Sequence, residues 1–242
     1  MENDIDLRRI LFVDIETVPQ QPSFDELSEE WQTLWLKKAK ILSKYHPEEL
    51  EDHLYQRAGI YSEFGRIVCI SAGFFHKEGN ELHLRISSFA HNDEKELLEK
   101  FGQLLNSHFY KRYHFLCAHN GQEFDFPYIC RRTLLNGLEL PNGLRIMGNK
   151  PWENKHLLDT MKLWAFGDIK SFTSLEVMAH AFGIPTPKDD ISGADVYRVY
   201  YEEKNLNRIV EYCQKDVATL ANLFCSLMGK PYIESDKIEI VQ

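Results

Sequence analysis

The chain has 242 residues, 43% of them hydrophobic, so it can bury a large core, and its length fits one domain over residues 1–242 better than two. The formal net charge of -9 argues against a protein that binds nucleic acid over its whole surface, although a local basic patch would still follow a phosphate backbone. No stretch approaches the ~18 to 20 apolar residues of a membrane span, and the first residues lack a hydrophobic signal core. The five cysteines show no CxxC spacing. We expect a cytoplasmic protein with no membrane contact and no disulfide partner, and the cysteines indicate no zinc site.

A buried strand and an inserted pair of helices are predicted for the first quarter of the chain. Residues 10–15 form a short apolar run, which predicts a buried strand. The capping-box pair Ser23 and Glu26, followed by apolar residues at helical spacing, predicts a helix from Ser23, and residues 47–58 predict a shorter one. We interpret residues 20–62 as an inserted helical hairpin.

The rest of the chain predicts an antiparallel hairpin of strands followed by alternating helices and strands. The two strands are residues 66–75 and 81–89, joined by a glycine-containing turn. The later elements are a helix capped by Asn92, a strand over 113–118, a helix over 126–135, a weak strand over 156–159, a helix opened by a capping box of Thr173 and Glu176, and a last helix over 206–228. The tail, residues 230–242, is polar enough to fray. This order predicts a mixed sheet covered by helices.

Two acidic side chains interrupt the first strand. Asp14 and Glu16 are two residues apart on a strand and therefore point to the same face. Two like charges at the end of a buried strand are costly unless a cation neutralises them, and hard oxygen ligands suit Mg²⁺ or Mn²⁺. The alternative is that both are exposed strand-end acids, or that Asp14 caps a turn.

A second polar cluster occupies residues 118–125, which leave a strand through a glycine turn and enter a helix. Asp125 stands where either a helix N-cap or a metal ligand would be expected. Asn120 has a structural alternative as the residue that ties the turn to itself, and His119 is more typical of a packed, hydrogen-bonded histidine than of a ligand.

A third cluster lies on the last helix, where Tyr212 and Asp216 are four residues apart and share a face. Asp216 flanks an apolar stripe that includes Cys213 and Val217, so this face is expected to look toward the sheet, where an acid is unusual. The alternative is that Asp216 pairs with Lys215 or an arginine while Tyr212 packs as a half-buried aromatic.

Together and in this order, Asp14 and Glu16 in the run FVDIET, Asn120 followed by Asp125, and Tyr212-xxx-Asp216 resemble the three exonuclease motifs of the DEDDy proofreading-type superfamily. The closest likeness is to the 3′-5′ exonuclease domain of family-B DNA polymerases and its predicted stand-alone relatives. It covers roughly residues 11–226 apart from the insertion. The resemblance implies a ribonuclease-H-like α/β fold, with a mixed five-stranded sheet flanked by helices.

The resemblance also implies a role for each motif residue. Asp14 would bridge two divalent cations, Mg²⁺ or Mn²⁺, while Glu16 and Asp216 would complete the ligands of the first and Asp125 would hold the second. Tyr212 would orient the attacking water.

Further positions follow the same resemblance. Thr17, Asn120 and Phe124 match positions that contact or pack near the terminal nucleotide, although Phe124 has an alternative role in the core. Glu211 stands where the sister DEDDh group carries its histidine, which favours the tyrosine subtype.

The resemblance implies a metal-dependent 3′-5′ exonuclease that hydrolyses terminal phosphodiesters of single-stranded or frayed DNA and releases nucleoside monophosphates. Two alternatives remain: an exoribonuclease that trims RNA 3′ ends, and a non-catalytic nucleic-acid-binding domain of the same fold. The sequence identifies no polymerase or repair partner.

The insertion has no counterpart in the family pattern, and its charged and aromatic residues favour a structural interpretation. Trp31 and Trp35 are more typical of core packing than of base stacking. Arg131 and Arg132, after the second cluster, form a candidate basic edge. A solvated helix end is favoured over a phosphate-binding patch for four clustered lysines, Lys37, Lys38, Lys40 and Lys44.

Overall fold

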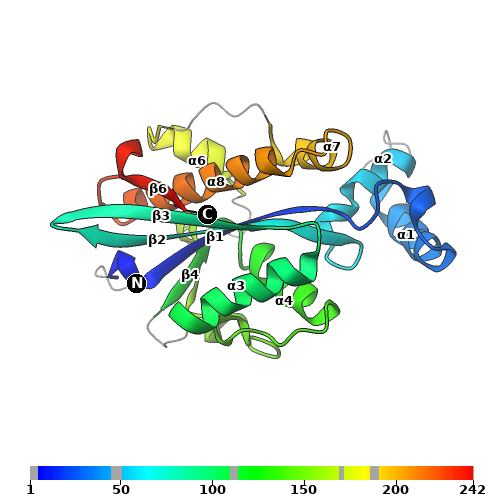
Figure 1. Cartoon of the computed structure of the whole chain (residues 1–242), viewed down its shortest axis with the longest axis horizontal. Coiled ribbons are helices and arrows are strands. Elements are labelled where there is room, and N and C mark those ends of the chain that lie inside the picture. Colours follow the sequence, from blue (N-terminus) through cyan, green and yellow to red (C-terminus); the bar gives the residue numbers. More distant parts are fainter. Residues whose placement is uncertain (1–4, 45–50, 110–113, 169–171, 186–190, 242) are drawn as a thin grey trace.

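A mixed six-stranded sheet forms the centre of the protein, as seen in a computed structural model that describes residues 5–44, 51–109, 114–168, 172–185 and 191–241 (Figure 1). The strand order is β5-β4-β1-β2-β3-β6. β2 runs antiparallel to its neighbours β1 and β3, whereas the pairs β1–β4, β4–β5 and β3–β6 are parallel. The strands are β1 Ile10–Pro19, β2 Gly65–Glu78, β3 Glu81–Ala90, β4 Phe115–Ala118, β5 Leu157–Asp159 and β6 Ile238–Val241.

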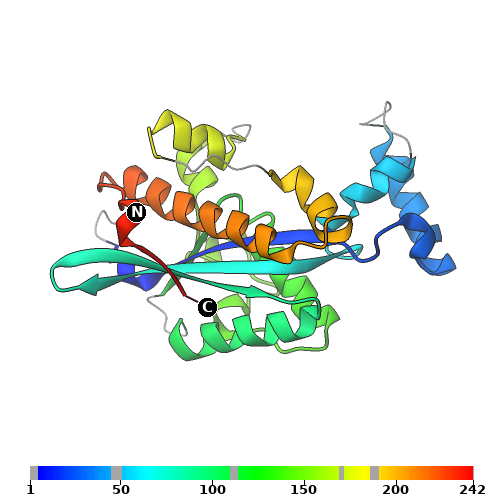
Figure 2. The ribbon, with the colours of Figure 1, turned by 45° about the horizontal axis from the view of Figure 1, so that its top comes forward.

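Helices cover both faces of this sheet, with α3 and α4 on one side and α6, α7 and α8 on the other (Figures 1 and 2). The alternation of side chains along β1 divides the core, because Leu11 and Val13 join a cluster with α3 while Phe12 joins a cluster with α8. Among the described residues, no helix has the length and apolarity needed to cross a membrane. The helices are α1 Glu29–Leu42, α2 Glu51–Gln56, α3 Glu94–His108, α4 Asp125–Leu135, α5 Thr160–Trp164, α6 Leu175–Ala181, α7 Val196–Tyr201 and α8 Leu206–Leu227.

The predicted α/β class is confirmed, but the expected count of five strands is wrong. The sixth is β6, which lies within the tail that was expected to fray. It pairs with the free edge of β3, with Leu84 opposite Ile238. The side-chain amide of Asn222 on α8 anchors the segment before it, since Nδ2 donates to the Ile233 carbonyl and Oδ1 accepts from the Ile233 N–H. An exposed sheet edge offers unpaired backbone groups that even a four-residue strand can satisfy.

Several helix starts differ from the prediction by one to six residues. α1 begins at Glu29 with Ser28 as its N-cap. Ser23 and Glu26 instead hydrogen-bond to each other around a short 3₁₀ turn, over a distance of 3.1 Å. The motif there resembles a capping box, but Leu27 leaves the turn with an extended backbone, so the helix starts later.

Two other helices are capped by the neighbour of the expected residue. Asp93 rather than Asn92 caps α3, and Ser174 rather than Thr173 caps α6. In each case the observed cap is a residue of the same capping type one position later. The first residues of the second inserted helix, predicted from 47, lie outside the described residues, and α2 ends at Gln56 before a 3₁₀ turn.

The insertion between β1 and β2 packs its own aromatic cluster at one end of the molecule, where α1 and α2 lie (Figure 1). Trp35 is 1% exposed and makes edge-on contacts with the rings of Tyr55 and Phe64, at centroid distances of 5.5 and 5.1 Å. This tryptophan is therefore a core residue. Lys38 lies over the ring of Tyr61, 3.9 Å from its centroid.

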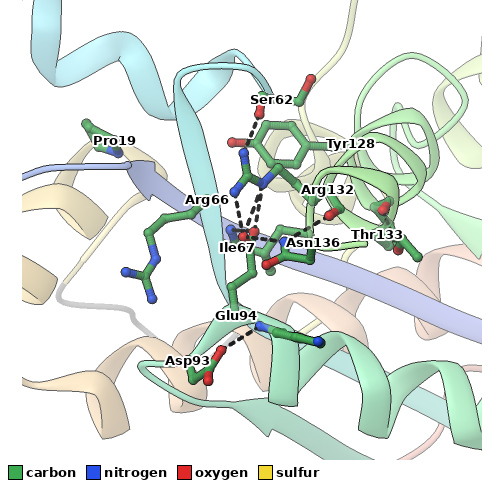
Figure 3. Close-up of polar contacts among 12 residues, drawn as sticks. Pro19, Ser62, Arg66, Ile67, Asp93, Glu94, Tyr128, Arg132, Thr133 and Asn136 are labelled. Atoms are coloured by element: carbon green, nitrogen blue, oxygen red, sulfur yellow. Dashed lines mark hydrogen bonds and ion pairs between the residues drawn. The ribbon is translucent and has the colours of Figure 1, made fainter. Parts of the chain in front are cut away.

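The predicted basic edge at Arg132 is wrong, because this side chain is buried in an ion pair that joins α4 to α3 (Figure 3). Its Nη2 donates to Glu94 Oε2 at 2.6 Å, and its Nη1 donates to the Ser62 carbonyl at 2.9 Å. The carboxylate of Glu94 also accepts from the Ile67 N–H and from the Asn136 amide. Every oxygen of this buried acid is thus satisfied, as a buried charge requires.

Candidate active site

β1 carries two acids to the face of the sheet that α8 covers. Asp14 and Glu16 alternate with buried apolar residues, so they point to the same side as Phe12, whose ring packs against α8. Glu16 is only 7% exposed and Asp14 is half-buried. The pairing register with β2 shifts between Glu16 and Thr17, which marks a β-bulge, and the pairing then continues to Pro19.

α8 brings three polar side chains to the same place. The Tyr212 hydroxyl donates a hydrogen bond to the Asp216 carboxylate one helical turn away. The Cys213 thiol donates to Asp14 Oδ2, with 3.3 Å between sulfur and oxygen. Ligand atoms of Asp14, Glu16 and Cys213 all lie within 4.8 Å of one another. The contact between Cys213 and Asp14 therefore joins the first motif to the third.

Asp125 completes the group from the start of α4. It is 4% exposed, and its carboxylate accepts a hydrogen bond from the backbone N–H of Ile15 on β1. The N-cap position of α4 belongs to Phe124, so the alternative role of Asp125 as the N-cap is wrong. The carboxylate of Asp125 thus accepts from its own backbone N–H at the start of α4 and from the first motif.

The loop that leads to Asp125 is held by a buried aspartate at the end of β5. Asp159 is 2% exposed and accepts backbone N–H bonds from Asn120 at 3.0 Å and Gln122 at 3.1 Å. Its Oδ1 also accepts from Met161 at 3.0 Å, at the start of α5. Asn120 has a left-handed backbone with φ of 61°, a conformation in which asparagine is enriched. Asp159 thus fixes the shape of the second motif without belonging to it.

Because several carboxylates are buried close together here, their pKa values are raised. Burial first, and then the charges of Asp125 and Asp216, raise the pKa of Asp14 well above its usual range. Burial and the neighbouring charge of Asp14 do the same to the pKa of Glu16. Burial also raises the pKa of Asp125 to about 7. Four acids from three segments are therefore close enough to repel one another.

This donor set fits divalent cations of the hard type. Carboxylate oxygens are the ligands that Mg²⁺ and Mn²⁺ prefer, and their positive charge would remove the repulsion that raises these pKa values. Cys213 does not alter that character, because burial raises the pKa of its thiol and keeps it protonated. Asp14, Glu16, Asp125 and Asp216 are the residues that would hold such ions.

The residues expected near a terminal nucleotide lie around this group. Thr17 is half-buried on β1, and its hydroxyl donates to the hydroxyl of Tyr128. Phe124 packs against the core cluster beneath α3, with its ring centroid 5.3 Å from that of Tyr128. Asn120 lines a cavity of about 350 Å³ that extends to Phe172. Their contact with a nucleotide stays a prediction.

His119 is held by two hydrogen bonds and faces away from the carboxylates. Its Nε2 lies 2.8 Å from the Thr173 carbonyl and its Nδ1 lies 2.8 Å from the Thr160 hydroxyl. A carbonyl only accepts, so Nε2 carries the proton and Nδ1 accepts from Thr160. Burial lowers the pKa of this histidine, which agrees with the neutral ring.

Cys213 and Asp159 are the two site residues that sequence reasoning missed. Cys213 precedes Asp216 by three positions and so shares its helical face. This spacing could have identified it, but the sequence analysis assigned Cys213 to the apolar stripe of the helix. Asp159 carried a weaker signal, an acid at the end of a predicted strand, and nothing in the sequence connects it with residues 120–122.

Protonation of Asp125 makes a testable prediction for the metal-free protein. The native state holds this proton up to about pH 7, while the unfolded chain releases it near its ordinary value of 3.8. Between these two pH values the native state binds more protons than the unfolded chain. The contribution of protonated Asp125 to the free energy of unfolding is therefore complete at low pH and is lost as the pH rises toward 7. The loss has an upper bound of roughly 4 kcal/mol.

We expect the melting temperature of the EDTA-treated protein, measured between about pH 5 and pH 8, to fall more for the wild type than for Asp125→Asn. Asp195→Asn is the matched control. Hydrogen bonds from Arg198 and Ser192 lower the pKa of Asp195 to about 2, so this exposed acid does not titrate in the window. Parallel curves for wild type and Asp125→Asn would contradict the assignment.

Comparisons with known proteins identify the family of the chain. No curated protein matches the chain. Solved structures that match include the family B DNA polymerase from the hyperthermophilic archaeon Pyrobaculum calidifontis, at 15% identity and a TM-score of 0.49, over 88% of this chain and 24% of the polymerase chain. The chain thus spans about a quarter of that polymerase's length. A family model described as "Predicted 3'-5' exonuclease related to the exonuclease domain of PolB" matches residues 60–230, well over half of the chain. The chain therefore belongs to this family of predicted 3′-5′ exonucleases related to the exonuclease domain of PolB.

Proposed function

We propose that this protein is a metal-dependent 3′-5′ exonuclease that hydrolyses the terminal phosphodiester of single-stranded or frayed DNA and releases nucleoside monophosphates. The observation that carries the proposal is the convergence of Asp14, Glu16, Asp125 and Asp216 from β1, α4 and α8, with Tyr212 beside them. Burying four acids together has no structural benefit unless cations join them.

The four carboxylates would hold the divalent ions, Mg²⁺ or Mn²⁺, in a two-metal-ion mechanism. Bound ions of this kind supply a nucleophile at neutral pH and charge stabilisation for the leaving oxygen. The protein contributes the placement: β1 fixes Asp14 and Glu16 within the sheet, and the Ile15 N–H directs the Asp125 carboxylate toward them.

Tyr212 would position the attacking water by hydrogen bonding rather than remove its proton. Burial, and then the charge of Asp216, raise the pKa of the Tyr212 hydroxyl far above its usual value, so it stays protonated at neutral pH. A neutral hydroxyl held by Asp216 presents its oxygen as an acceptor to water. The Cys213 thiol, also protonated, steadies Asp14 by donating to it.

A cavity next to the second motif suits an unpaired nucleotide strand. It has a volume of about 350 Å³ and extends from Asn120 to Phe172 along α5. Phe172 in its lining is 73% exposed, and Phe166, between the lining residues Ala165 and Gly167, is 87% exposed. Bases of a single strand stack on such side chains without regard to sequence, which favours a single-stranded end over a duplex.

The test is cleavage of 5′-labelled single-stranded DNA and RNA of matched sequence, with Mg²⁺, Mn²⁺ or EDTA. We expect a ladder that shortens from the 3′ end, needs the metal and is more complete on DNA. A ladder on RNA alone would identify the exoribonuclease alternative, since the 2′-hydroxyl separates the two substrates. Absence of cleavage with binding retained would indicate the non-catalytic alternative.

Replacing Tyr212 by Phe should slow turnover by roughly 10- to 100-fold, in the range typical of one positioning group, because the water loses its hydrogen-bond partner. Binding of Mn²⁺ should be unchanged, since the carboxylates remain. Titration with Mn²⁺, followed by calorimetry, checks this. If Tyr212→Phe lost the ions as fully as Asp14→Asn, its assignment as a positioner of water would be wrong.

A further inference from the structure

Two histidines and two glutamates meet beside the turn of the β2–β3 hairpin, on the sheet face covered by α3. His76 on β2 is directly opposite His83 on β3, and Glu239 on β6 is opposite Arg85 on β3. Glu78 follows His76 by two residues and therefore points to the same face. This cluster is separate from the carboxylates of the candidate active site, which lie on the opposite face under α8.

The ligand atoms of this cluster have the spacing of a coordination shell. His76 Nε2 lies 3.4 Å from Glu239 Oε1 and 3.5 Å from Glu78 Oε1. His83 Nδ1 lies 3.7 Å from the same oxygen of Glu239. Nitrogen and oxygen ligands about 2.0 to 2.1 Å from a tetrahedral Zn²⁺ are roughly 3.3 to 3.4 Å apart. Atoms of His76, Glu78 and Glu239 can thus surround one ion with small adjustments.

Direct hydrogen bonding accounts poorly for these contacts. Hydrogen bonds from a ring N–H to a carboxylate are usually about 2.7 to 2.9 Å long, and all three distances exceed that. His76 Nε2 also faces two carboxylate oxygens, and it carries at most one proton. One cation between them would satisfy both carboxylate oxygens and Nε2 of His76 at once.

Arg85 orients the carboxylate of Glu239 so that one oxygen faces the histidines. Its Nε and Nη2 both donate to Glu239 Oε2, at 3.0 and 2.9 Å, so this oxygen is occupied and Oε1 is left toward the histidines. An outer partner that holds a ligating carboxylate is the usual support of a metal site. The guanidinium also lies 3.5 Å from His76 Nε2 and weakens the attraction for a cation. Two carboxylates against one guanidinium still leave one net negative charge when the rings are neutral.

We propose that His76, Glu78 and Glu239 form a second site for a zinc-type divalent cation, and that His83, which contacts Glu239, turns in as the fourth ligand. Imidazole ligands distinguish it from the all-oxygen site under α8, because imidazole suits Zn²⁺ and Co²⁺ more than Mg²⁺. The ion would join β6 to the β2–β3 hairpin and so fasten the short edge strand that begins at Ile238. Its role is structural, and it does not depend on the proposed exonuclease activity.

The experiment titrates Co²⁺ into untagged, EDTA-stripped protein and follows visible absorption, whose intensity reports tetrahedral coordination. Asp14→Asn serves as the background, so that the carboxylate site does not compete. We expect one equivalent to bind with an intense band, and His76→Gln and His83→Gln each to weaken binding at least tenfold. Adding Zn²⁺ should displace the band and raise the melting temperature of the parent protein but not of these variants.

His91→Gln is the matched control, because His91 is an exposed histidine 3.4 Å from a single acid, Glu96, and lies outside the cluster. It should bind Co²⁺ as the parent does. Circular dichroism confirms that the variants are folded. Failure of the parent itself to give a saturable band would overturn the proposal whatever the variants do, as would an unchanged band in both His76→Gln and His83→Gln.

Discussion

Asp14→Asn is expected to reduce metal-supported cleavage roughly a thousandfold or more, since loss of charge stabilisation worth several kcal/mol translates into that factor. Asp14 lies on β1 and contacts α8, with the Cys213 thiol 3.3 Å from its Oδ2. The fold should survive, because asparagine has the same size and the substitution removes a charge that Asp125 and Asp216 repel. Mononucleotide release and the melting temperature, measured together, check both parts.

Glu211→Gln is the control for this loss. Glu211 precedes Tyr212 on α8 but is exposed, so the substitution changes the charge of the same helix without entering the carboxylate group. We expect a rate within about twofold of the wild type, as for most surface substitutions. Comparable losses in Asp14→Asn and Glu211→Gln would mean that overall charge, and not the site, determines the rate.

Arg132→Ala is expected to have the largest effect on stability, a loss of about 3 to 5 kcal/mol, because it leaves the buried carboxylate of Glu94 without its cation. Both side chains are well buried, at 13% and 6% exposed, and their ion pair ties α4 to α3 (Figure 3). Urea unfolding measures the change. The double variant Glu94→Gln/Arg132→Ala should recover part of the loss, since no unpaired charge remains in it.

Arg131→Ala is the matched control, because its side chain is the exposed neighbour of Arg132 on the same helix. Its free energy of unfolding should stay within about 0.5 kcal/mol of the wild type. Equal effects of the two alanine substitutions would contradict the buried ion pair.

The sequence was sufficient where the placement of a side chain follows local periodicity. Asp14 and Glu16 are two residues apart on a strand, and Tyr212 and Asp216 are four apart on a helix, so each pair shares a face by geometry alone. The family model matches from residue 60, which leaves Asp14 and Glu16 outside the matched stretch. Their position beside Asp125 and Asp216 in the fold therefore supports the site independently of that match.

Contacts between distant segments were beyond reach of the sequence. Arg132 pairs with an acid 38 positions earlier, and its predicted exposure rested on charge alone. Asp159 reaches back 39 residues to the Asn120 N–H. The strand Ile238–Val241 depends on a free edge of β3, and nothing within these four residues identifies that partner. In each case tertiary packing, not local propensity, decides the outcome.

The most direct test of the central claim is release of labelled mononucleotide from single-stranded DNA that carries its label at the 3′-terminal residue, with Mn²⁺, by wild type and Asp14→Asn. We predict that the wild type releases the terminal nucleoside monophosphate first, that EDTA stops the release, and that Asp14→Asn releases almost none. Release by Asp14→Asn at the wild-type rate, or wild-type cleavage that begins away from the 3′ end, would contradict the assignment of these carboxylates as a 3′-5′ exonuclease site.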